Sequence, residues 1–150
     1  MPQIRRNIKL NEICSKVTVA ELDFTKSLPL GIIKDVDVIL AADVIYDPVV
    51  TKAFFRCLGD IALYCLATRG RVEAYVAMEA RSRGIDDLDT LKIMQGELER
   101  FKERTDIRDV LTVDLIEKGS FQQKFAYNSA CADMHMWRLA FKSFKKVTAS

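Results

Sequence analysis

The chain has 150 residues, of which 49% are hydrophobic and 29% are charged, and its formal net charge is +2. This length and hydrophobic fraction suit one domain with a core of its own. So small a net charge does not favour binding to nucleic acid. The sequence contains no apolar run of the roughly 18 residues that a membrane-spanning helix needs, and its first residues lack the apolar core of a signal peptide. We therefore expect neither a membrane nor a nucleic acid as partner.

The cysteines indicate a reducing compartment. The four cysteines are scattered without CxxC spacing, at positions Cys14, Cys57, Cys65 and Cys131. Two of them fall within an apolar helical pattern, which is typical of reduced core thiols in a cytoplasmic or nuclear protein. A zinc site is not expected, because the chain has one histidine and no paired ligands.

The first third of the chain predicts a helix and two strands. Residues 3–12 resemble the end of a helix that stops near Asn11, and residues 16–21 are β-branched and predict a short strand. Residues 23–35 contain Pro29 and Gly31 and predict a loop. Residues 36–42 are almost continuously apolar, which predicts a parallel strand covered on both faces.

The remainder predicts two helices and three strands. Asp47 and Pro48 are typical of a helix start, and apolar residues at helical spacing continue to residue 68, before Gly70. Residues 71–78 predict the next strand, and Asp86 and Asp87 open a second amphipathic helix. Residues 110–117 and 134–141 alternate as two further strands, joined by a polar stretch that contains three aromatic residues.

This order of elements predicts an α/β fold with a mostly parallel sheet. The last two strands have no helix between them, so we expect an antiparallel hairpin at one edge. Ligands of open α/β sheets bind at the carboxyl ends of the strands. Asp43 and Tyr46 follow the apolar strand directly and are therefore candidate site residues. The simpler alternatives, a loop-starting residue for Asp43 and a core lid for Tyr46, stay open.

Several segments resemble the family 16 protein methyltransferases, which have a seven-stranded, Rossmann-like fold and depend on S-adenosylmethionine. Residues 43–46 (Asp-Val-Ile-Tyr) look like the family's DxxY motif at the end of its fourth strand. Residues 7–11 (Asn-Ile-Lys-Leu-Asn) resemble the N-x-x-x-N helix end after the second strand. Residues 21–24 (Glu-Leu-Asp-Phe) resemble the ELDW segment after the third strand.

The resemblance implies a protein-lysine methyltransferase with S-adenosylmethionine as cofactor and a lysine side chain of a protein as substrate. Phe24 stands where the family usually has Trp beside the cofactor, and Ala42 matches the strand end near the cofactor. Asp43 and Tyr46 match the mouth where the lysine meets the methyl group. The change from Trp to Phe at position 24 removes an indole N–H and keeps a stacking surface.

The resemblance also implies that part of the fold is missing. No GxGxG occurs in the chain, and its six glycines are isolated. By the motif positions, residues 1–150 correspond to the C-terminal part of a methyltransferase domain, without the first two strands. We expect the chain to carry the substrate-side half of the pocket and to be inactive alone. The alternative is a non-catalytic truncated isoform or fragment that at most binds other proteins.

The missing strands predict a free edge on the strand at residues 36–42. A buried backbone group left without a partner costs roughly 1–3 kcal/mol. We therefore expect residues 17–21 either to close up against residues 36–42 or to be poorly ordered.

Overall fold

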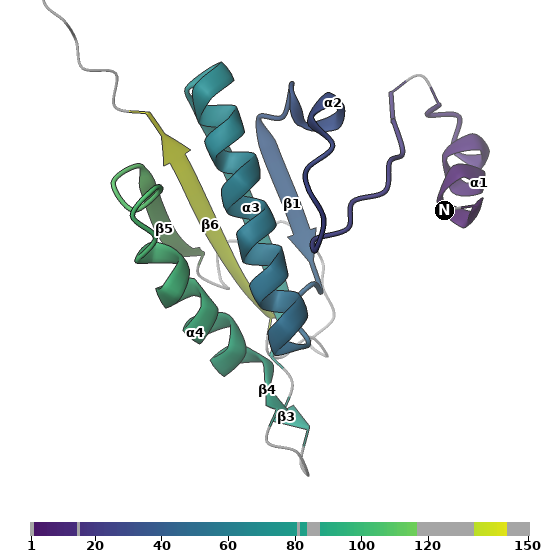
Figure 1. Cartoon of the computed structure of the whole chain (residues 1–150). Coiled ribbons are helices and arrows are strands. Elements are labelled where there is room, and N and C mark those ends of the chain that lie inside the picture. The colour runs from purple at the N-terminus through teal and green to yellow at the C-terminus, as the bar shows by residue number, and fades with distance from the viewer. Residues whose placement is uncertain (1, 15, 81, 84–87, 117–133, 144–150) are drawn as a thin grey trace, which may run out of the picture.

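The structure, a computed structural model, describes residues 2–14, 16–80, 82–83, 88–116 and 134–143. Its helices are α1 (Pro2–Leu10), α2 (Leu30–Ile33), α3 (Pro48–Arg69) and α4 (Thr90–Lys102). Its strands are β1 (Val38–Ala42), β2 (Arg71–Glu79), β3 (Ser82–Arg83), β4 (Leu88–Asp89), β5 (Leu111–Ile116) and β6 (Met134–Lys142). The predicted α/β class is confirmed, and Figure 1 shows the arrangement of these elements.

The main sheet has four strands in the order β1-β2-β6-β5. β1 pairs in parallel with β2, whereas β6 runs antiparallel to both β2 and β5. Within the described part of the chain, three strands of this sheet therefore point the same way and β6 opposes them. The predicted C-terminal antiparallel hairpin is confirmed as the pair β5–β6. β3 and β4 form a separate two-stranded antiparallel sheet.

Both long helices cover the same face of the main sheet (Figure 1). The alternate residues of β2 that face them, including Val72, Ala74 and Val76, are fully buried. Phe54, Leu58 and Cys65 are among the α3 residues in this core, and α4 adds Met94, Leu98 and Phe101. Burial of this apolar surface is the main stabilising contribution to the fold.

The ends of α3 are fixed by local chemistry, as predicted. The carboxylate of Asp47 accepts hydrogen bonds from the backbone N–H groups of Val49 and Val50 at 2.8 and 2.9 Å. Gly70 adopts a left-handed φ of 75° and caps the carboxyl end. α4 begins at Thr90 and is capped by Asp89, whose carboxylate accepts hydrogen bonds from the N–H groups of Leu91 and Lys92. Asp86 and Asp87, which were predicted to open this helix, lie outside the described residues.

The predicted strand at residues 16–21 is wrong, because the described part of this segment has no strand structure. It does not close up against β1, which has β2 as its strand partner among the described residues. β-branched residues favour a strand only where a neighbouring strand and a packed surface are present. α1 precedes this segment and has no buried residue. Figure 1 shows α1 apart from the sheet.

The second face of the sheet is open among the described residues, so the prediction that β1 is covered on both faces is wrong there. Leu40 is 79% exposed and Val38 is 52% exposed. The register places Leu40 beside Tyr75 of β2, and Tyr75 beside Arg138 of β6. On this face Arg138 donates hydrogen bonds to Glu73 at 2.6 Å and to Asp114 at 3.2 Å. Arg138 holds the pKa of the Glu73 carboxyl below its usual range.

Candidate functional site

The candidate site is built on the turn that leaves β1. Asp43 has a left-handed φ of 56°, which is uncommon for a residue other than glycine. Its backbone N–H donates to the carbonyl of Ala77 on β2 at 3.1 Å, so the turn is attached to the neighbouring strand. The Asp43 side chain is exposed, and among the described residues its carboxylate makes no hydrogen bond or ion pair. This carboxylate is free to meet an incoming group.

Tyr46 lies three residues further along the same turn. Its side chain is 57% exposed, whereas Ile45 before it is buried in the core. Asp47 after it caps α3. An anchored residue on each side therefore holds Tyr46 at the surface of the turn that carries Asp43. Asp43 and Tyr46 therefore lie on the same turn, and the exposure of Tyr46 argues against its being a core lid.

An apolar cavity of about 250 Å³ lies beside this turn, between β1, α3 and the segment that ends at Phe24. Both residues that the resemblance placed near a cofactor line it. The other lining residues are apolar as well, apart from the thiol of Cys57: Leu22, Ile39, Leu40, Ala41, Val44, Phe54, Leu58 and Ile61. Because Ala42 lines the cavity and Asp43 follows it, the carboxylate is placed at the end of the strand that forms the cavity wall.

Phe24 is held in this cavity by a polar turn and by α3. The Asp23 carboxylate accepts hydrogen bonds from the backbone N–H and the hydroxyl of Thr25, at 2.9 and 2.7 Å. The guanidinium of Arg56 donates to the Phe24 carbonyl at 3.1 Å. The Phe24 ring packs edge-on against Phe54, with 5.5 Å between ring centroids. Phe24, although it lies in a loop, is thus held in a defined position against α3.

The thiol that lines this cavity is not activated. Burial raises the pKa of Cys57, and it does the same for Cys65 deeper in the core. A nucleophilic cysteine needs a lowered pKa, because the thiolate is the reactive form. Both cysteines therefore pack as small apolar side chains. Cys131 lies outside the described residues.

The other sequence-based candidates have different positions. His135 and Trp137 share one face of β6, as strand alternation predicted, and their rings stack with centroids 5.7 Å apart. Glu79 ends β2 and is half-buried rather than fully solvated. The aromatic residues of the polar stretch, Phe121, Phe125 and Tyr127, lie outside the described residues.

The described residues contain neither a metal-binding cluster nor a membrane-spanning helix. No group of three or more His, Cys, Asp or Glu side chains lies close enough together there to hold a metal ion. None of the described helices is long and apolar enough to cross a membrane.

A second cavity, of about 450 Å³, was not predicted. It lies over the outer side of α3 and shares no lining residue with the cavity at Ala42. We place the candidate site at the smaller cavity, because the exposed Asp43 carboxylate and the carboxyl end of β1 are there. The larger one joins residues far apart in the sequence, from Thr25 to Arg104, so no local motif could have revealed it.

The site and the fold together define a class of protein. An α/β sheet with a free carboxylate and an apolar cavity at the carboxyl end of a strand is typical of enzymes that bind a ligand at that edge. Residues 1–94, more than half of the chain, match the model of the lysine methyltransferase family. The chain belongs to this family. No curated protein matches the chain.

The cavity fits one side of S-adenosylmethionine, the cofactor of this family. The ring of Phe24 offers a stacking surface, and the small side chains of Ala41 and Ala42 let a ligand approach the strand backbone. The lining side chains include no carboxylate, amide or hydroxyl that could hold the ribose or the amino acid part. The side chains of the described lining therefore offer a bound ligand apolar contacts only.

Proposed function

We propose that this chain contributes to an S-adenosylmethionine-dependent protein-lysine N-methyltransferase. The observation that carries the proposal is the position of Asp43. The Asp43 carboxylate is exposed and has no partner among the described residues. It lies next to an apolar cavity lined by Phe24 and Ala42. The chain belongs to the lysine methyltransferase family.

The proposed roles follow from the chemistry of the lysine side chain. The cofactor supplies an electrophilic methyl group on a sulfonium. The Asp43 carboxylate accepts a hydrogen bond from the substrate amine and orients its nitrogen. Tyr46 borders the entrance and contributes an apolar ring and a hydroxyl. Phe24 and Ala42 form the cofactor wall and exclude water on that side.

We further propose that residues 1–150 form the C-terminal part of the methyltransferase domain, carry its substrate-side half and are inactive alone. The cavity of about 250 Å³ supports this, because ligand sites usually measure about 300–1,000 Å³. The lack of a GxGxG turn in the sequence also supports it, because backbone approach to such a cofactor normally requires one.

Calorimetric titration of this chain with S-adenosylmethionine tests the half-pocket proposal. We expect no saturable heat at micromolar concentrations, because the described lining offers no polar group to the ribose or the carboxylate. Saturable binding in the low micromolar range would show that the chain holds a complete pocket.

The catalytic proposal needs a chain in which a glycine-rich cofactor loop precedes residues 1–150. In that protein, Asp43→Ala should abolish transfer of labelled methyl groups to a protein substrate and leave the chain folded, with only the modest drop in thermal midpoint that alanine causes at a left-handed φ. Asp109→Ala is the matched control, because Asp109 is also exposed and lies far from the cavity in sequence and structure. Full activity of Asp43→Ala would remove Asp43 from the site.

Within the family, we propose that the chain is related to the methyltransferase-like protein 22 branch. Two segments support this, residues 45–58 and the Met-His-Met-Trp-Arg-Leu sequence at residues 134–139. A cytoplasmic or nuclear location is also proposed, on the basis of free Cys14, Cys57 and Cys65. The second candidate function, a non-catalytic fragment that binds other proteins, is favoured by the open sheet face at Leu40. A longer active chain from the same gene would separate the two candidates.

A further inference from the structure

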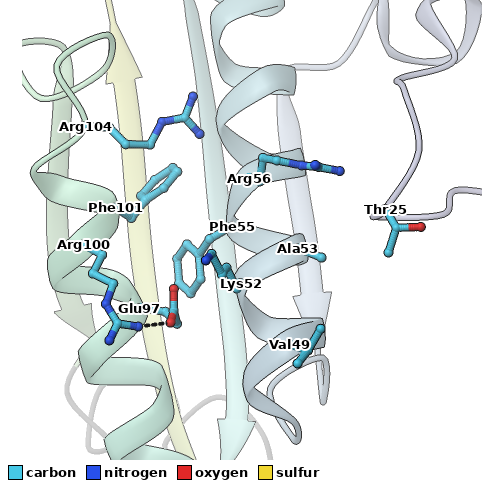
Figure 2. A pocket seen from close by; sticks show the side chains of 10 residues that line it. All are labelled: Thr25, Val49, Lys52, Ala53, Phe55, Arg56, Glu97, Arg100, Phe101 and Arg104. Atoms are coloured by element: carbon cyan, nitrogen blue, oxygen red, sulfur yellow. Dashed lines mark hydrogen bonds and ion pairs between the residues drawn. The ribbon is translucent and has the colours of Figure 1, made fainter.

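A groove crosses the outer side of α3, between α4 and the turn at Thr25 (Figure 2). It encloses about 450 Å³ and is formed by three separate parts of the chain. The lining residues are Thr25, Val49, Lys52, Ala53, Phe55, Arg56, Glu97, Arg100, Phe101 and Arg104. We call it the α3–α4 groove. It shares no lining residue with the cavity at Ala42, so it is a separate feature.

The α3–α4 groove is strongly cationic. It contains four basic side chains, Lys52, Arg56, Arg100 and Arg104, and one carboxylate, Glu97. Within the described residues Lys52 makes no ion pair, and the partner of Arg56 is the uncharged carbonyl of Phe24. Arg100 pairs with Glu97, yet the Arg100 side chain remains 71% exposed. The chain as a whole carries only +2, so positive charge is concentrated here.

Arg104 is fixed in the wall of the groove. Its guanidinium lies over the Phe101 ring, 5.7 Å from the centroid. It donates two hydrogen bonds to Asp106, at 2.7 and 3.1 Å. The guanidinium lies against Gly59 of α3, where a Cβ would overlap it and force the arginine side chain to shift. The charge of Arg104 is largely balanced by Asp106, so Lys52, Arg56 and Arg100 are the cations left to meet a ligand.

Apolar surface lies between these cations. Val49 is 74% exposed on the first turn of α3, and Ala53 follows it one turn later. Figure 2 shows Val49, Ala53 and Arg56 along one side of α3, with Phe55 and Phe101 between the two helices. The small side chain of Ala53 leaves room above the helix. The groove can therefore accept an apolar side chain as well as negative charge.

We propose that the α3–α4 groove docks an acidic segment of a partner protein, with glutamate or aspartate side chains that meet Lys52, Arg56 and Arg100 and an apolar side chain that packs over Ala53. Charge complementarity steers and orients such an encounter. Laying one apolar side of a peptide into a groove is a common mode of peptide recognition. Nucleic acid fits less well, because the exposed Val49 and the half-buried Ala53 offer apolar contacts that a sugar-phosphate backbone does not use.

The test measures binding of the whole chain to a fluorescein-labelled amphipathic peptide with glutamates on one side and leucines on the other. The matched probes are the same peptide with glutamine in place of glutamate and a labelled single-stranded oligonucleotide. We expect saturable binding of the glutamate peptide that weakens as salt is raised, and at least fivefold weaker binding of the other two probes.

Two variants locate the binding. Lys52→Glu should weaken binding of the glutamate peptide at least fivefold. Lys34→Glu makes the same charge change outside the groove and should leave this binding unchanged. Val49→Asp should also weaken it, and this variant keeps α3 folded because an acidic residue suits the first turn of a helix. Equal binding of the three probes, or full affinity in Lys52→Glu with an unchanged thermal midpoint, would overturn the proposal.

Discussion

At the scale of single residues, Asp23 is an acid with a strongly shifted pKa, and it orders the turn beside Phe24. The Thr25 hydroxyl, the Thr25 N–H and the nearby Lys26 ammonium lower the pKa of Asp23 from 3.8 to about 2. A lowered pKa means that the folded chain favours the ionised form. The contribution of this turn to stability is therefore fully present above about pH 4 and is lost as the pH falls towards 2.

Replacing Thr25 should reverse part of this shift. In Thr25→Val the hydroxyl donor is lost and the backbone N–H remains, so the pKa of Asp23 should rise partway from about 2 towards 3.8. An NMR titration of the side-chain carboxyl carbons measures this value directly. Thr68→Val is the control, because the Thr68 hydroxyl bonds within α3, to the carbonyl of Tyr64. An Asp23 pKa of 3.8 in the unmodified chain would contradict the hydrogen-bonded turn.

At the scale of elements, two glycines should respond in opposite ways to alanine. Gly70 ends α3 with a φ of 75°, where a side chain is strained. Gly70→Ala should therefore lower the free energy of unfolding by roughly 1–2 kcal/mol. Gly96 lies inside α4, is exposed, and has open space where a Cβ would be. Gly96→Ala should raise the free energy of unfolding by up to about 1 kcal/mol, because alanine is the better helix former.

Urea denaturation followed by circular dichroism measures both changes, and each variant is the control for the other. Destabilisation by Gly96→Ala would mean that the open space beside Gly96 is occupied. A neutral Gly70→Ala would mean that α3 does not end in a left-handed residue.

These elements also show what the sequence can and cannot predict. The bounds of α3 were predictable because Asp47, Pro48 and Gly70 act through bonds within a few residues of themselves. The strand at residues 16–21 was not, because a strand depends on a distant partner, and β1 does not supply one. Asp43 could be named as a candidate from its place after an apolar strand. Its left-handed φ was not, and neither was the α3–α4 groove, whose cations come from separate helices.

At the scale of the whole molecule, a row of aromatic rings connects the candidate site to the far side of the core. Phe24, Phe54, Phe55, Phe101 and Phe141 follow one another with centroid separations of 5.5, 5.4, 5.2 and 6.2 Å. The row runs from the cavity wall through α3 and α4 to β6. Three of these four pairs are edge-on, and such pairs add roughly 0.5–1.5 kcal/mol each beyond the apolar area that they bury. The site wall and the sheet therefore share one core.

Phe54 is the ring that joins the cavity to this core, so its removal should affect the whole molecule. It is buried and contacts both Phe24 and Phe55. Phe54→Ala should cost roughly 3–5 kcal/mol, a large part of the roughly 5–15 kcal/mol that stabilises a domain. Phe54→Leu is the control and should cost clearly less, because leucine fills more of the space that alanine leaves empty.

Trp137, the single tryptophan, reports on the outcome from the sheet. It lies on β6, is buried and is not in contact with Phe54 through any of the ring pairs. If the described elements form one cooperative unit, Phe54→Ala should lower the urea midpoint equally by Trp137 fluorescence and by circular dichroism at 222 nm, a wavelength that reports helix content. α1 has no buried residue and is shorter than the roughly 12–15 residues that an isolated helix needs, so it should contribute little to either signal. Separate midpoints for the two signals would mean that α3 and the sheet unfold independently. In that case the position of Asp43, which is bonded to β2 and followed by α3, would not be fixed by one core.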